Sequence, residues 1–131
     1  MSSKDLRAIA HQSKYPLAAF LFVQRGLDYT VRSIHGDPPE DEDPAARESR
    51  HVSGRDLCYG LRDYAIEQYG LLARIVLRRW RIERSEDFGH IVFTMVEAGL
   101  MHKTDEDTIA DFEDVFDFSE AFVPELSLSG E

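Results

Sequence analysis

The spacing of the apolar residues between Pro16 and Glu97 most limits what this chain can fold into. Large apolar side chains recur there at intervals of three and four residues, which is the period of an amphipathic helix. Breaks in this pattern predict helices that begin near residues 4, 16, 53, 71 and 85. After Gly99 the spacing changes to alternation, which is typical of strands.

Local signals refine these helices. Gly26 lies inside the helix predicted over 16–34, where glycine costs about 1 kcal/mol relative to alanine. We therefore expect another helix to approach closely at Gly26. Ser53 and Ser85 are placed to cap the helices that they precede, and Asp56 stands where a capping box has its carboxylate.

The helical period also predicts which faces are buried. In the helix after Gly70, one stripe should face the core and an arginine stripe should face solvent. The inward stripe consists of Leu71, Leu72, Ile75, Val76 and Trp80. In the helix that begins at Ser85, the outer face should carry Asp87, His90, Thr94 and Glu97.

The alternation after Gly99 predicts a β-hairpin. Bulky apolar residues alternate with polar ones on both sides of the acidic stretch Asp105-Glu106-Asp107, which would be the exposed turn. Three helices followed by a hairpin is the order of a winged-helix domain, so residues 53–118 are predicted to form a winged-helix-like core. The predicted fold class is therefore α+β, mainly α, with a helical N-terminal part packed on this core.

The length of 131 residues and the apolar share of 43% favour one domain with a real core. Within it we expect N-terminal helices over 1–36 and a tail over 119–131. The Pro-rich, highly charged stretch 37–52 should be an exposed acidic loop.

Two features of the sequence bear on the cellular compartment. Cys58 is the single cysteine, so no internal disulfide can form, which favours a reducing compartment. The N-terminus lacks the pattern of a secretory signal peptide, and no apolar run reaches the eighteen residues that a bilayer span requires. We expect a cytoplasmic protein without membrane contact.

Three segments resemble one bacterial family. They are YPLAAFLFVQRGLDYT (15–30), RHVSGRDLCYGLRDYAIEQYGLLARIVL (50–77) and EDFGHIVFTMVEAGL (86–100), together with the aromatic, acidic ending up to Phe118. In them the chain resembles an uncharacterised, conserved hypothetical protein family largely restricted to planctomycete and verrucomicrobial bacteria. The resemblance implies a bacterial cytoplasmic protein and a stand-alone domain. It implies no activity, cofactor or catalytic residue.

The charge distribution is uneven. All 15 Lys and Arg residues precede Thr104, whereas ten of the 25 acidic residues follow Lys103. The net charge of −10 therefore resides in the last part of the chain, and an arginine cluster precedes it. An uneven charge distribution creates an electrostatic field that steers association with charged partners. The candidate partner-binding residues are Arg74, Arg78, Arg81, Arg84, Asp105, Glu106 and Asp107.

No cofactor or metal site is predicted. A calcium loop counted from Asp105 places Ile109, Ala110 and Phe116 at positions that need an oxygen ligand, glycine and glutamate. The scattered ligand types His11, His35, His51, Cys58, His90 and His102 lack zinc-site spacing. The best catalytic constellation is Cys58 at a helix start with His51 as its base, which ranks third among the functional hypotheses.

The first functional hypothesis is a non-enzymatic protein-interaction or adaptor domain that acts through charged surfaces, with a protein partner or self-association. The alternative is a nucleic-acid-associated regulator that uses the Arg74–Arg84 block. The winged-helix comparison disfavours this alternative, because the helix and turn that would meet phosphate carry acidic residues.

Overall fold

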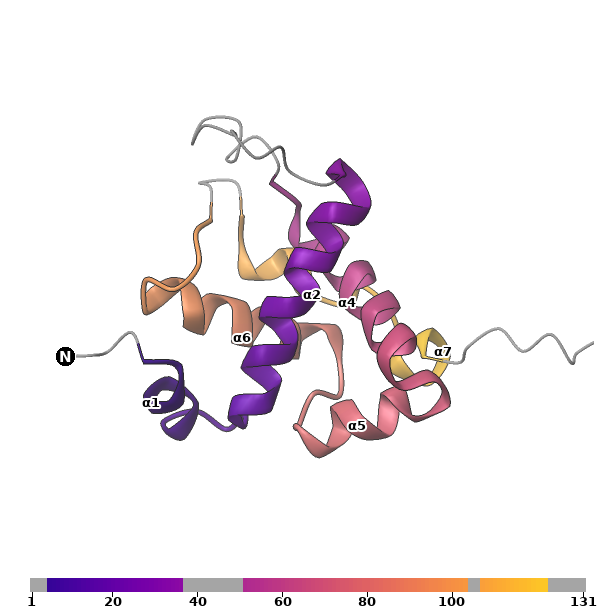
Figure 1. The fold of residues 1–131 in the computed structure, drawn as a ribbon, viewed down its shortest axis with the longest axis horizontal. Coiled ribbons are helices and arrows are strands. Elements are labelled where there is room, and N and C mark those ends of the chain that lie inside the picture. The colour runs from indigo at the N-terminus through magenta and orange to yellow at the C-terminus, as the bar shows by residue number, and fades with distance from the viewer. Residues whose placement is uncertain (1–4, 37–50, 104–106, 123–131) are drawn as a thin grey trace, which may run out of the picture.

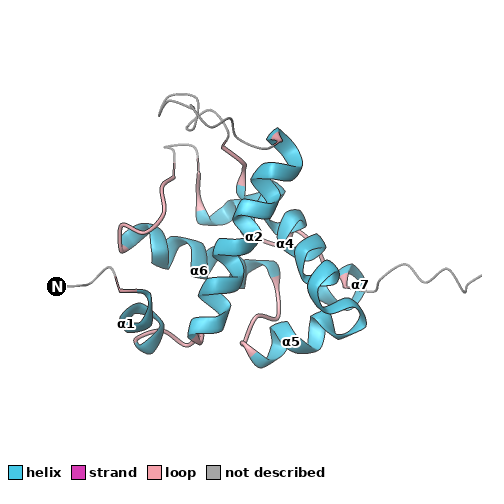
Figure 2. Cartoon of the chain, viewed as in Figure 1, coloured by secondary structure: helices cyan, strands magenta, loops and turns pink. Residues whose placement is uncertain are grey.

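The computed structural model describes residues 5–36, 51–103 and 107–122. Their helices confirm the five predicted helical segments (Figures 1 and 2). The elements are α1 (Leu6–His11), α2 (Leu17–His35), α4 (Gly54–Tyr69), the 3-10 turn η1 (Gly70–Leu72), α5 (Ala73–Arg79), α6 (Ser85–Glu97), the 3-10 turn η2 (Ile109–Phe112) and α7 (Phe118–Ala121).

Helix α2 runs through the middle of the molecule and packs against α4 and α6 (Figure 1). Helix α1 lies beside the start of α2, and α5 lies at the opposite end of the molecule from the C-terminal end of α2 (Figure 1). The core between these helices is fully buried and mostly aliphatic and aromatic. Its largest members are Phe20, Phe88, Leu61, Leu77, Ile82, Ile91 and Met95.

Two glycines let α2 and α4 approach closely. A Cβ atom at Gly26 would overlap the Leu61 side chain, and a Cβ atom at Gly60 would overlap Thr30. The Thr30 hydroxyl is buried and donates a hydrogen bond of 2.7 Å to the Gly26 carbonyl, so it needs no partner on α4. The close approach expected at Gly26 is confirmed, and Gly60 is its counterpart.

The predicted β-hairpin is wrong. Residues 5–36, 51–103 and 107–122 contain no strand, so the described chain is all helical and neither α+β nor winged-helix-like (Figure 2). Residues 107–122 instead form η2, α7 and the turns around them. Four apolar side chains of this segment are buried: Phe112, Val115, Phe118 and Phe122. The fold therefore extends to Phe122, four residues into the predicted tail.

The side chain of Ser85 supplies the hydrogen bonds that a neighbouring strand would supply in a sheet. Its hydroxyl donates to the Phe112 carbonyl at 2.6 Å and accepts from the Val115 amide at 3.1 Å. A buried backbone needs partners for its polar groups, and one buried hydroxyl here supplies both. Ser85 is therefore not the predicted cap, and Arg84 occupies the N-cap position of α6. By contrast, the predicted Ser53 cap is confirmed, since its hydroxyl accepts from the Asp56 amide at 3.0 Å.

Candidate functional site

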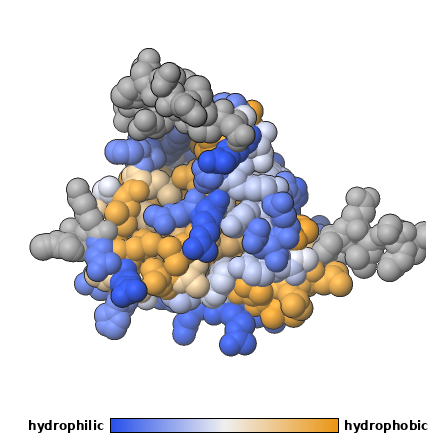
Figure 3. Space-filling model, viewed as in Figure 1, coloured by the Kyte–Doolittle hydropathy of each residue, from blue (hydrophilic) through white to orange (hydrophobic). Residues whose placement is uncertain are grey.

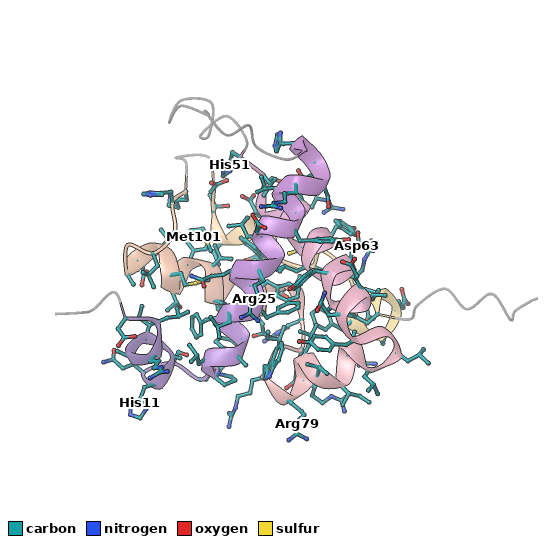
Figure 4. The ribbon with its side chains drawn as sticks, viewed as in Figure 1. His11, Arg25, His51, Asp63, Arg79 and Met101 are labelled. Carbon is teal, nitrogen blue, oxygen red and sulfur yellow. The ribbon has the colours of Figure 1, made fainter. Side chains whose placement is uncertain are left out.

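The predicted arginines are all exposed on the surface. Arg74 and Arg78 are one helical turn apart on α5, Arg81 follows in a left-handed turn, and Arg84 precedes α6. Asp107 lies elsewhere, because its carboxylate is 2.9 Å from Nε2 of His51 at the far end of the molecule from α5 (Figure 4). Asp105 and Glu106 lie outside the described residues. The structure thus does not bring Asp107 to the arginines.

Three members of the apolar stripe predicted to face inward are exposed at η1 and α5, whereas Val76 and Trp80 are half-buried. Leu71, Leu72 and Ile75 are 65%, 59% and 55% exposed, whereas Ala73 and Leu77 are fully buried. Helix α5 begins only at Ala73, after the 3-10 turn η1, in which Gly70 adopts a left-handed φ of 55°. Leu71 and Leu72 therefore do not share the phase of α5, and the Ala73–Leu77 stripe contacts the core instead.

These aliphatic residues and the arginines among them form one surface, here called the α5 surface. It consists of Leu71, Leu72, Ile75, Arg74, Arg78 and Arg79, all of which are exposed. Figure 3 shows apolar surface gathered over α5 at the lower right, next to hydrophilic side chains. Exposed aliphatic side chains that adjoin one another mark interaction sites more often than isolated ones do.

The carboxylate of Asp117 interacts electrostatically with Arg74 of this surface. Hydrogen bonds from the Ser119 hydroxyl and amide lower the pKa of Asp117, and the charge of Arg74 lowers it further. Because Asp117 is exposed, the lowering of its pKa contributes little to the stability of the fold. The α5 surface thus favours negative charge in its neighbourhood.

A cavity of about 620 Å³ lies at the other end of the molecule. It is bordered by the second half of α2, the start of α4, α6 and the segments around residues 101–103 and 107–112. Apolar side chains make up most of its wall, and His51, His102, Lys103 and Asp107 supply polar groups. This cavity was not predicted, because its walls come from five separate parts of the chain.

Cys58 is not placed for nucleophilic catalysis. Its side chain is fully buried, and burial raises the pKa of the thiol to about 12. A thiol in this state is neutral near pH 7 and a poor nucleophile. The proposed base, His51, hydrogen-bonds Asp107 and through its carbonyl contacts Nε2 of His35 at 3.1 Å.

Asp87 was predicted on the outer face of α6, but it is buried. Its carboxylate accepts hydrogen bonds from the amides of Glu83 and Arg84 at 2.8 and 3.2 Å and from the Tyr15 hydroxyl at 2.5 Å. Burial and the bond to Asp87 raise the pKa of Tyr15. The cluster joins the start of α2 to the start of α6, which is a structural role. The position of Asp87 in the first turn of α6 was the sequence signal for this role.

In the three described ranges, no three His, Cys, Asp or Glu side chains are grouped as metal ligands would be. No helix in the same ranges is long and apolar enough to cross a bilayer. A scan against known protein families finds no match, and searches of curated proteins and of solved structures find none either. The family resemblance drawn from residues 15–30, 50–77 and 86–100 therefore stays a prediction.

Proposed function

We propose that this chain is a protein-interaction domain whose α5 surface binds an acidic segment of a partner protein that also carries apolar side chains. The observation that carries the proposal is the exposure of Leu71, Leu72 and Ile75 beside three arginines. An apolar patch with a basic rim complements a segment in which aliphatic residues alternate with carboxylates.

The energies support a specific contact of moderate strength. Full burial of an aliphatic side chain stabilises by about 1.5–3 kcal/mol. Since 55–65% of Leu71, Leu72 and Ile75 is exposed, covering all three would contribute about 3–5 kcal/mol before the entropic costs of association. Arginine pairs with carboxylates through two parallel hydrogen bonds, so Arg74, Arg78 and Arg79 would add orientation and selectivity.

The alternative, a nucleic-acid-associated regulator, uses the same arginines. However, the described residues do not form the winged-helix arrangement that would place a helix in the DNA groove. Phosphate binding would also leave the three aliphatic side chains without a partner. Charge complementarity together with apolar exposure therefore favours a protein over a polyanion.

The test is binding of a labelled amphipathic peptide, with leucine on one face and glutamate on the other, measured by fluorescence anisotropy. A scrambled peptide of the same composition and a random duplex oligonucleotide are measured beside it. We expect Leu72→Glu and Arg78→Glu each to weaken peptide binding at least about tenfold, a loss of about 1.4 kcal/mol.

Matched controls separate this surface from general charge effects. Ile34→Glu changes an aliphatic residue of α2 that is 50% exposed, and Arg7→Glu changes an exposed arginine of α1. Both controls should leave peptide binding unchanged. Equal losses in controls and test variants would overturn the proposal. Tighter, Arg78-dependent binding of the duplex would overturn it in favour of the regulator.

A further inference from the structure

The cavity at the far end from α5 has the size and chemistry of a small-molecule site. Its volume of about 620 Å³ falls in the range of ligand pockets, roughly 300–1,000 Å³. Aliphatic and aromatic side chains from three helices and the following loop line it, as in most such pockets. Among them are Leu27, Val31, Leu57, Val92, Phe93 and Met101.

Phe112 also lines this space, and two glycines hold its ring there. A Cβ atom at Gly54 would lie 2.7 Å from the Phe112 ring, and one at Gly89 would lie 2.8 Å from its Cβ atom. Phe112 thus packs directly on the backbones of α4 and α6, and its ring also meets Phe93 edge to face at 6.1 Å. The wall is built from fixed contacts, so this part of the cavity does not depend on a mobile side chain.

The polar groups of the cavity are mostly basic. His51, His102 and Lys103 line it together with one acidic residue, Asp107, which is paired with His51 at 2.9 Å. Ser53 and Gly54, at the positive N-terminal end of α4, line it as well. Figure 4 shows His51 and Met101 on the same side of the upper half of α2. An apolar space thus adjoins a group of donors.

We propose that this cavity binds an amphipathic carboxylic acid, with its apolar body among the residues of α2, α4 and α6 and its carboxylate toward His102 and Lys103. The site is separate from the α5 surface and does not depend on the function proposed for it. The apolar wall contributes affinity, and the basic groups select the acid over a neutral molecule of the same shape.

The probe is dodecanoate, titrated by calorimetry below its micelle concentration, with dodecanol as the neutral analogue. We expect one dodecanoate to bind per chain and dodecanol to bind at least about tenfold more weakly. Val31→Trp places a large ring in the cavity and should weaken dodecanoate binding at least tenfold. Val76→Trp, at a half-buried position of α5 that does not line the cavity, should leave binding unchanged.

Methyl NMR of the methionines locates the ligand in the unmodified protein, so the test does not depend on the variants folding. The Met101 methyl lines the cavity and should shift on titration, whereas the Met95 methyl is buried in the core and does not line it. An unmoved Met101 signal, or no effect of Val31→Trp, would overturn the site. Equal affinity for dodecanoate and dodecanol would overturn the proposal that the ligand is a carboxylic acid. Leu72→Glu should not alter dodecanoate binding, so this result is independent of the peptide experiment.

Discussion

Replacing Ser85 by alanine tests how residues 107–122 are held on the helical core. The Ser85 side chain is fully buried and hydrogen-bonds the Phe112 carbonyl at 2.6 Å and the Val115 amide at 3.1 Å. Alanine would leave both groups buried without a partner, at about 1–3 kcal/mol each. We therefore expect the free energy of unfolding to fall by about 2–6 kcal/mol, a large share of the roughly 5–15 kcal/mol typical of a domain.

Urea denaturation followed by circular dichroism measures the total loss, and hydrogen exchange of the Val115 amide shows where it acts. The control is Ser119→Ala, because the Ser119 hydroxyl is exposed and bonds only the exposed Asp117 among the partners described. Its effect should stay within about 0.5 kcal/mol. A loss below about 1 kcal/mol for Ser85→Ala, with the Val115 amide still protected, would refute the claim that this hydroxyl replaces a strand partner.

Two further predictions concern the core. Gly60→Ala should lower the melting temperature, because overlap with Thr30 costs about 1–3 kcal/mol or more and exceeds the roughly 1 kcal/mol gained in helix propensity; a higher melting temperature would contradict the tight α2–α4 contact. The raised pKa values of Cys58, to about 12, and Tyr15 mean that both bind protons more tightly when folded. Their contribution to the free energy of unfolding is complete below about pH 9. It falls as pH rises, at up to about 1.4 kcal/mol per pH unit for each group. Urea midpoints between about pH 8 and 11 should therefore decline less steeply in Cys58→Ala with Tyr15→Phe, and an unchanged slope would count against this cause.

The helices could be predicted because their signals are local. Residues that recur every three or four positions give a helix one apolar face, and Ser53 caps α4 through a contact three residues away. Gly26 predicted a close helix approach for a similar reason, since a glycine inside a helix needs a compensating contact. The identity of the partner position, Gly60, required the three-dimensional arrangement.

The candidate sites could be predicted only in part. The arginines of the α5 surface were recognisable from their clustering and are exposed, but the exposure of Leu71 and Leu72 was not. A helical stripe predicts burial only if the helix extends over all its members, and here the 3-10 turn η1 intervenes. The cavity could not be predicted, since residues as distant as Leu27 and Asp107 line it.

By itself the sequence determined which segments between residues 4 and 97 are helical and which residues carry charge, because these depend on neighbours within one or two turns. Only the tertiary structure decided the path of the segment after Gly99. Alternating side chains allow a strand, but a strand needs a partner, and the buried Ser85 hydroxyl binds that backbone instead. The same holds for Asp87, which binds Tyr15 across 72 positions of the chain.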